Sequence, residues 1–299
     1  MGIFSEKLQD AIANKHIKIY YQPVIRTLSK KLCSFEALAR WEDPELGILN
    51  PKLFIDELEQ NEMIHILDCY MIDEICNSYK LRLNEKTAMV PISFNLSRLD
   101  FTLCDIFHYI ESTIKKYQVP REMFILEITE SILETKDSHT RNIINQFHDA
   151  GYKVWMDDFG SGYSSLNVLK DYDFNQLKID MEFLSVFNEK SKKIITSIVE
   201  MSKRIGVQSL AEGVETMEQL DFLTEIGCDK AQGYYFGKPM CYTDLMEHCI
   251  SRNFIPESRP DAKLYDAVSS IHFVTDQSFG ILLLKKKSYG METPKSERT

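Results

Sequence analysis

Short apolar runs in this chain repeatedly end in an acidic or carboxamide side chain. The runs cover residues 33–36, 90–95, 124–127, 154–158, 177–180, 210–212 and 231–232. A carboxylate inside an apolar strand costs several kcal/mol unless it is paired or bound to a metal. One such position could arise by chance. The repeated series predicts that several strands bring charged groups to a single place.

Segments with apolar residues spaced three and four apart lie between these runs and predict helices. They cover residues 51–81, 99–117, 132–150, 183–205 and 216–226, and Gly151, Gly206 and Gly227 follow the last three as expected C-caps. The alternation starts with a strand at residues 18–24. About eight strand–helix units predict an α/β fold with a parallel, closed (β/α)8 barrel of the TIM type. A doubly wound sheet is the rival, but it would more often carry a Gly-rich loop after its first strand, and none is present.

In such barrels the active site forms where the strands end, and each of several strands supplies one residue. The strand-end residues expected to ring this mouth are Glu36, Asn95, Glu127, Asp157, Lys178, Glu212 and Gln232. With Asp158 they contain an all-oxygen set of carboxylates and one carboxamide, which favours Mg²⁺ or Mn²⁺ over zinc. Adjacent Asp157 and Asp158 suit a bridged pair of cations of the kind used in phosphoryl transfer. Lys178 could position or deprotonate a water at these cations, and Arg40 offers a fork for a phosphate.

The composition indicates which classes of ligand and which cellular compartment to expect. The net charge is −10 and no basic run is present, so a nucleic acid polymer is not the expected ligand. Seven cysteines without Cys-x-x-Cys spacing argue against a zinc knuckle or a disulfide framework, and favour a reducing, cytoplasmic location. No apolar stretch approaches the roughly 20 residues of a membrane span, so no direct membrane contact is expected. The first residues lack the pattern of a secretory signal.

The repeating pattern stops near residue 255. We therefore expect one domain over residues 1–252. Residues 253–299 are expected to form a linker, which contains Pro256 and Pro260, followed by a C-terminal extension. That extension is either an extra strand and helix docked on the barrel or the start of a further domain.

The motifs occur in a fixed order along the chain. They are Glu36-Ala37-Leu38, Asn95-Leu96-Ser97, Glu127-Ile128-Thr129-Glu130, Asp157-Asp158-Phe159-Gly160-Ser161-Gly162, Leu177-Lys178-Ile179-Asp180, Ala211-Glu212-Gly213-Val214-Glu215 and Gln232-Gly233-Tyr234. Over residues 3 to 250 the chain resembles the EAL-domain family of cyclic di-GMP phosphodiesterases, which is named for the tripeptide at 36–38. The resemblance implies hydrolysis of cyclic di-GMP to 5′-pGpG with two Mg²⁺ or Mn²⁺ ions.

The resemblance also implies a role for each matching residue. The metal ligands would be Glu36, Asn95, Glu127, Asp157, Asp158 and Glu212, and the catalytic residues Lys178, Glu212 and Asp158. The residues holding the dinucleotide would be Gln22, Leu38, Arg40, Asp180 and Gln232. The residues in supporting or loop roles would be Glu130, Gly160 and Glu215. The loop after Asp158 would carry contacts of a homodimer.

One departure and two alternatives accompany this interpretation. Met181 stands where many relatives carry Arg, which puts a contact of that side chain in question. The first alternative is a catalytically silent receptor that binds cyclic di-GMP. The second is a barrel lyase of the enolase type, which also combines strand-end carboxylates, Mg²⁺ and a lysine base but fits the Asp-Asp-Phe-Gly loop poorly.

Overall fold

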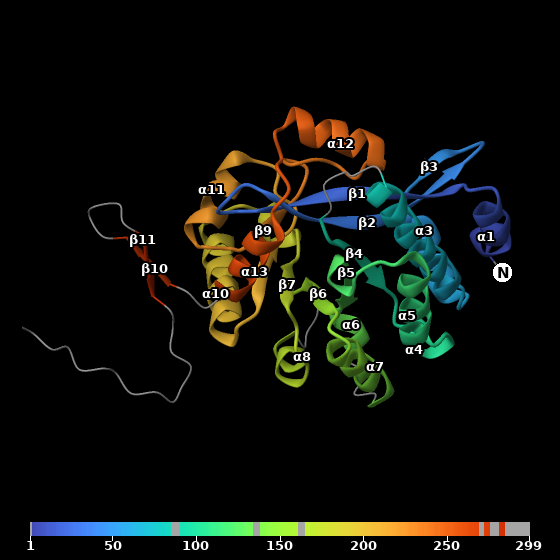
Figure 1. Cartoon of the computed structure of the whole chain (residues 1–299), viewed down its shortest axis with the longest axis horizontal. Coiled ribbons are helices and arrows are strands. Elements are labelled where there is room, and N and C mark those ends of the chain that lie inside the picture. The colour runs from blue at the N-terminus through green and yellow to red at the C-terminus, as the bar shows by residue number, and fades with distance from the viewer. Residues whose placement is uncertain are drawn as a thin grey trace, which may run out of the picture.

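A closed barrel of eight strands forms the centre of the molecule (Figure 1). The computed structural model describes residues 2–84, 90–133, 138–160, 165–268, 272–275 and 281–284. The sheet order is β1-β9-β8-β7-β6-β5-β4-β2-β3, and an additional β1–β2 pairing closes the ring, with β3 attached outside β2. The bounds are β1 Ile17–Arg26, β2 Leu32–Asp43, β3 Gly47–Leu49, β4 Ile92–Leu96, β5 Phe124–Thr129, β6 Lys153–Phe159, β7 Gln176–Ile179, β8 Gln208–Ala211 and β9 Lys230–Gln232. The predicted α/β barrel is confirmed.

The first strand differs from the prediction of a wholly parallel sheet. β1 runs antiparallel to both of its neighbours, β2 and β9, while the pairs from β2–β4 through β8–β9 are parallel. The reason is the connection: only residues 27–31 separate β1 from β2, which is too short for a crossover helix and suits a hairpin. The barrel therefore starts with a hairpin where we expected a strand–helix unit.

Helices surround the barrel, and several expected helices are divided in two. The helices are α1 Ile3–Ala13, α2 Pro51–Gln60, α3 Ile64–Asn84, α4 Asp100–Leu103, α5 Ile106–Tyr117, α6 Glu130–Leu133, α7 Ser138–Asp149, α8 Ser165–Asp171, α9 Glu182–Ser185, α10 Glu189–Ile205, α11 Met217–Glu225, α12 Tyr242–Ser251 and α13 Arg259–Val268, with a 3-10 turn at Arg121–Met123. The three expected C-terminal glycines all have positive φ, from +69° to +90°. The 3.6-residue periodicity therefore located the helical regions but not the breaks within them.

The core has an inner and an outer part. Inside the barrel a small apolar group contains Val24, Cys33, Ile125, Trp155 and Leu210. The larger cluster packs the strands against the outer helices, and Trp41 belongs to a separate cluster beneath the N-terminal helices α1 and α2. This packing fixes the strands so that polar side chains at their ends are held in a set geometry.

The chain continues past the barrel helices into α13 and a hairpin. The hairpin pairs β10, His272–Thr275, with β11, Ile281–Leu284. Asp266 of α13 (labelled in Figure 1) contacts Arg26 at the end of β1, Lys153 at the start of β6 and Gln208 at the start of β8. In the part of the chain that the structure describes, no helix is both long and apolar enough to cross a membrane.

Candidate metal centre

The C-terminal ends of the parallel strands deliver the predicted ring of polar residues. These residues are Glu36 on β2, Asn95 on β4, Glu127 on β5, Asp157 on β6, Lys178 on β7, Glu212 directly after β8 and Gln232 at the end of β9. Asn95 and Glu127 are direct partners across β4 and β5. Gln22 joins the ring from β1, because the antiparallel register places it opposite Glu36. The structure therefore brings the predicted set together at one mouth of the barrel.

Lys178 lies at the centre of this ring and is almost wholly buried. Its Nζ is 2.6 Å from Glu127 Oε2, and 2.8 Å from both Asp157 Oδ1 and Glu212 Oε1. Glu36 Oε1 is more distant, at 3.6 Å. The lysine side chain is 1% exposed, so these pairs are little screened by solvent. One ammonium group thus faces four carboxylates from four strands.

The surroundings raise the pKa values of three central groups, although burial and the opposite charges nearby act in opposite senses on each. Burial opposes the charge of Lys178, but the carboxylates of Asp157, Glu127 and Glu212 outweigh it and raise its pKa well above the usual range. Burial raises the pKa of Glu127 well above its usual range, despite the opposing effect of Lys178. Burial likewise raises the pKa of Glu212 to about 8. The cluster holds more acid than one lysine neutralises, which is the condition under which a cation would bind.

Glu36 is held by carboxamide donors on both sides. Asn95 Nδ2 donates to Glu36 Oε1 at 3.1 Å, and Gln232 Nε2 donates to Glu36 Oε2 at 2.5 Å. Gln232 also donates to Gln22 Oε1 at 3.2 Å, and Gln22 in turn donates to the carbonyl oxygen of Gly237 at 3.1 Å. These bonds link the last strand to the first. The carboxamides thereby fix the orientation of a carboxylate predicted to bind metal.

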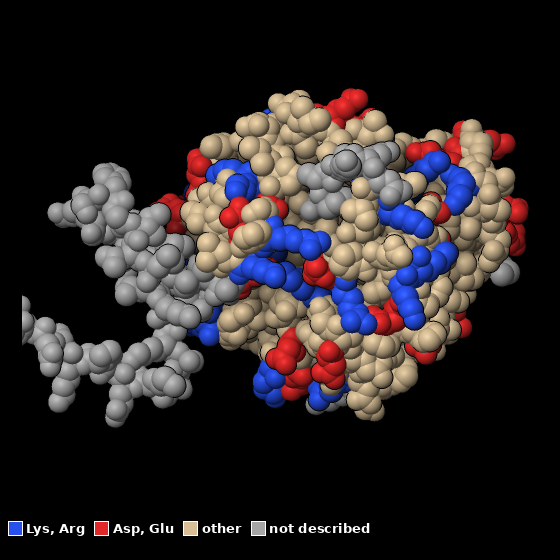
Figure 2. All heavy atoms as spheres, viewed as in Figure 1, with Lys and Arg blue, Asp and Glu red and all other residues tan. Residues whose placement is uncertain are grey.

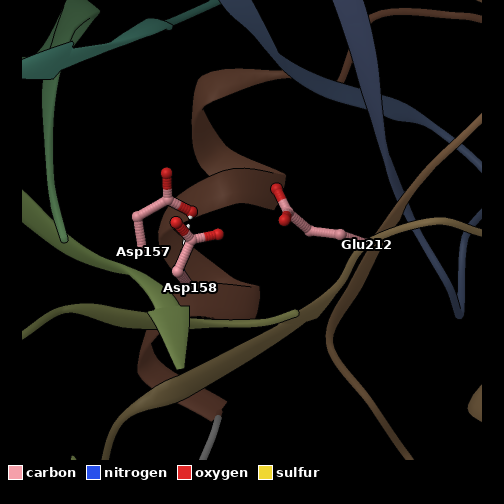
Figure 3. Close-up of side chains that lie close together, drawn as sticks. All are labelled: Asp157, Asp158 and Glu212. Atoms are coloured by element: carbon pink, nitrogen blue, oxygen red, sulfur yellow. Dashed lines mark hydrogen bonds between the residues drawn. The ribbon is translucent and has the colours of Figure 1, made fainter. Parts of the chain in front are cut away.

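Asp157 and Asp158 both face Glu212, although neighbours on a strand normally point to opposite sides (Figure 3). The reason is a register irregularity between Met156 and Phe159 in β6 and a left-handed backbone at Asp158, with φ of +54°. Aspartate tolerates this conformation better than most residues. Oxygen atoms of Asp157, Asp158 and Glu212 all lie within 4.8 Å of one another. The irregularity therefore converts consecutive acids into a convergent group.

Burial raises the pKa of Asp158 to about 6. The carboxylates of Asp157 and Asp180 raise this pKa further, and Lys178 lowers it. Asp180 lies beyond β7 and also accepts the backbone N–H of Glu182 at 2.6 Å. The predicted substrate contact Asp180 is thus adjacent to the acidic group.

The donor chemistry of the site fits divalent cations that prefer oxygen ligands. Glu127 is fully buried, and its Oε1 has no hydrogen-bond partner among the residues that the structure describes. A buried carboxylate oxygen with no donor is costly unless something positive binds it. The oxygens of Asp157, Asp158 and Glu212 converge nearby, and all these ligands are hard. The residues present therefore fit Mg²⁺ or Mn²⁺.

Leu38 and Arg40 lie on the same face of β2 as Glu36, because the side-chain period of a strand is two. Both are partly exposed. The Arg40 guanidinium lies 5.6 Å from the ring centroid of Tyr20, and its Nη1 donates to the carbonyl oxygen of Ala39 at 2.8 Å. Tyr20 was not expected from the sequence, although its place two residues before Gln22 puts it on the same face of β1. Arg40 is therefore positioned at the rim of the mouth.

The residues expected to have supporting roles fall in different environments. Glu130 is buried at the start of α6, whereas Glu215 is exposed in the segment before α11. Gly160 has φ of +96°, and a β-carbon there would lie 2.6 Å from the ring of Phe183, so glycine is required at the end of β6. Residues 161–164, in the loop expected to carry dimer contacts, lie outside the described residues. Met181 is 57% exposed beside α9.

Comparison with known proteins identifies relatives over most of the chain. The model of the EAL domain family matches residues 5–239. The bifunctional diguanylate cyclase/cyclic di-GMP phosphodiesterase MucR of Pseudomonas aeruginosa is 32% identical over 241 residues, which is 80% of this chain and 35% of that protein. The probable cyclic di-GMP phosphodiesterase PdeB of Escherichia coli is 33% identical over 241 residues, 80% of this chain and 46% of PdeB. The chain thus spans less than half the length of these two relatives.

A solved structure supports the same grouping. The structure titled "PaMucR Phosphodiesterase, c-di-GMP complex" superimposes with a TM-score of 0.76 at 31% identity, and covers 81% of this chain and 99% of that one. The matched part of this chain therefore has the fold of the compared domain. The resemblance drawn from the motifs is confirmed at the level of the family.

Proposed function

The chain belongs to the EAL domain family, and we propose that it is a metal-dependent phosphodiesterase that hydrolyses cyclic di-GMP to 5′-pGpG. The observation that carries the proposal is the cluster at the barrel mouth. There Lys178 lies within 2.8 Å of three carboxylates from different strands, beside the convergent oxygens of Asp157, Asp158 and Glu212. Relatives about a third identical are named as cyclic di-GMP phosphodiesterases, and this supports the choice of substrate.

Two Mg²⁺ or Mn²⁺ ions would be held by the strand-end oxygens. The first would take Glu36, Asn95, Glu127 and Asp157, and the second would take Asp157, Asp158 and Glu212. When bound, such ions supply Lewis-acid stabilisation to the phosphodiester and to the attacking water. The Oε1 of buried Glu127, which has no hydrogen-bond partner in the described part of the chain, supports the assignment of the first set.

The chain's own groups would bind the substrate and orient the water. Lys178 carries a raised pKa and so acts as a hydrogen-bond donor, which favours orienting the water over removing its proton. Glu212 and Asp158 would accept that proton. Attack at phosphorus breaks the bond to the 3′ oxygen, and this leaves a 5′ phosphate and a 3′ hydroxyl.

The dinucleotide would be gripped at the rim. Its contacts would be Gln22, Leu38, Arg40, Asp180 and Gln232. Arg40 is the group suited to a phosphate, since its planar fork matches phosphate oxygens. We also propose a homodimer through the loop after Asp158. The odd cysteine count without paired spacing supports a cytoplasmic location.

The experiment that tests this function is incubation of the purified chain with cyclic di-GMP and Mg²⁺, followed by chromatographic separation of the nucleotides. Controls are excess EDTA and Glu36→Gln, which replaces a metal-binding carboxylate by a neutral group of the same shape. We expect 5′-pGpG from the parent chain alone. Binding of intact cyclic di-GMP without product would instead identify a receptor. Neither binding nor turnover would remove cyclic di-GMP as the ligand.

A further inference from the structure

The floor of the barrel, opposite the candidate metal centre, carries a second charged cluster. Arg26 at the end of β1 is 3% exposed and forms a two-pronged pair with Glu257, at 2.9 Å and 2.7 Å. Glu257 lies between the barrel and α13, beyond the residues matched by the family model. Its backbone N–H donates to the carbonyl oxygen of Leu32 at 2.7 Å. The segment after α12 is therefore joined to the first two strands by buried polar contacts.

Asp266 on α13 extends this cluster to further strands. Its carboxylate is 2.5 Å from Lys153 Nζ at the start of β6 and 3.4 Å from Arg26 Nη2. Gln208 at the start of β8 donates to Asp266 Oδ1 at 3.1 Å. Next to Asp266, the ring of Tyr265 lies 4.8 Å from the Arg26 guanidinium. Figure 2 shows basic side chains gathered across the middle of the face that includes α13.

The strands tied to this segment also carry residues of the candidate metal centre. In each case the floor residue and the mouth residue are four positions apart. The pairs are Arg26 and Gln22 on β1, Leu32 and Glu36 on β2, Lys153 and Asp157 on β6, and Gln208 and Glu212 along β8. Four residues of extended strand span only about 13 Å. Short, packed strands therefore connect the floor contacts directly to the mouth.

We propose that residues 255–268 form a clamp that belongs to the barrel, and that Asp266 is a positioning residue which sets the strand ends of the metal centre from the opposite side. The clamp neutralises Arg26 and Lys153, which would otherwise repel each other at the floor. It also joins β1 and β2 to β6 and β8 across the ring. By this proposal the folded unit extends to residue 268 and does not end at 252. The clamp stabilises the barrel itself, whatever the mouth binds.

Asp266→Asn tests the proposal, because it removes the charge and keeps the shape and one acceptor. The matched control is Asp261→Asn on the same helix. Within the described residues, Asp261 pairs only with Lys31, at 2.8 Å and 37% exposed on both sides, whereas Asp266 is 26% exposed and also meets Arg26, which is 3% exposed. We expect Asp266→Asn to lower the melting temperature by about 4–8 °C, against less than about 2 °C for the control. Hydrogen–deuterium exchange should accelerate at least about threefold in peptides covering the mouth ends of β6 and β8.

Two results would overturn the proposal. One is a melting temperature for Asp266→Asn within a degree of the control. The other is faster exchange confined to residues 255–268, which would make α13 a passive appendage. If Asp266→Asn does not fold, Tyr265→Leu removes only the ring stacked on Arg26, and the same exchange pattern at β6 and β8 is expected at smaller amplitude. If the exchange rates at the mouth ends of β6 and β8 were unchanged in Tyr265→Leu, the proposed coupling between floor and mouth would be rejected.

Discussion

Lys178 is the residue on which the account of the mouth depends. A buried ammonium group is costly by itself, and here it is retained because three carboxylates lie within 2.8 Å. The same geometry allows two roles. Lys178 either orients the attacking water, or it only neutralises the acidic cluster so that the barrel can fold.

The variant Lys178→Ala separates these roles. If the lysine orients the water, kcat should fall by about 10²–10⁴-fold, while binding of cyclic di-GMP changes much less because Arg40, Gln22 and the metals remain. The measurement is the rate as a function of Mg²⁺ concentration. Recovery of the rate at high Mg²⁺ would show that Lys178 acts only through charge neutralisation.

Glu36→Gln makes a second prediction at the residue scale, on stability. Four carboxylates share one lysine, so replacing one of them by a neutral group should relieve repulsion. The glutamine side chain can still accept a hydrogen bond from Asn95 or Gln232. In excess EDTA we expect a melting temperature equal to or above that of the parent chain, measured by calorimetry. A fall of several degrees would mean that Glu36 is a structural group.

At the scale of single elements, β6 illustrates what the sequence could and could not predict. The apolar run and its terminal acids predicted a strand whose end carries Asp157 at the mouth. The register irregularity that turns Asp158 toward Glu212 was not predictable, because strand periodicity places consecutive side chains on opposite faces. β1 is a second example of a strand that was predicted without its local geometry. Its residues indicated a strand, but its antiparallel direction depends on the hairpin with β2.

Lys230 on β9 provides a prediction for the floor of the barrel. Burial lowers its pKa to about 8, and its Nζ donates to Gln176 Oε1 at 2.5 Å above the ring of Trp155. Between pH 8 and the unfolded value of 10.5 the unfolded chain binds more protons at this group, so its contribution to stability rises with pH there. Compared with Lys230→Met, the parent chain should gain up to about 3 kcal/mol across that window, measured by urea unfolding. A difference that stays flat with pH would contradict the prediction.

At the scale of the whole molecule, the sequence predicted the residues at the mouth of the barrel but not the charged residues at its floor. The mouth residues end apolar runs within ordered motifs, so their convergence could be expected from the barrel alone. Arg26, Glu257 and Asp266 carry no such pattern, since a charged residue at a strand end, in a connecting segment or on a short helix usually faces solvent. Arg26 and Glu257 are buried, and the Asp266 side chain is only 26% exposed, because α13 docks against the barrel. The sequence therefore left open whether the segment after residue 252 joins the barrel.

The ligand set predicts which cations support turnover. Mg²⁺ and Mn²⁺ suit the compact carboxylate group, whereas Ca²⁺ prefers more ligands at longer distances. We expect activity with Mg²⁺ or Mn²⁺, none in EDTA, and inhibition when Ca²⁺ is added to the Mg²⁺ enzyme. Rates measured across a series of cations check this, and full activity in EDTA would contradict the metal assignment.

The most direct test of the central claim is the fate of one water oxygen. Cyclic di-GMP is incubated with the chain and Mg²⁺ in ¹⁸O-labelled water, and the product is analysed by mass spectrometry. The account predicts 5′-pGpG that carries one labelled oxygen on its terminal 5′ phosphate, because water attacks phosphorus and the bond to the 3′ oxygen breaks. Cyclic di-GMP recovered intact and unlabelled after binding, or a product without label, would contradict it.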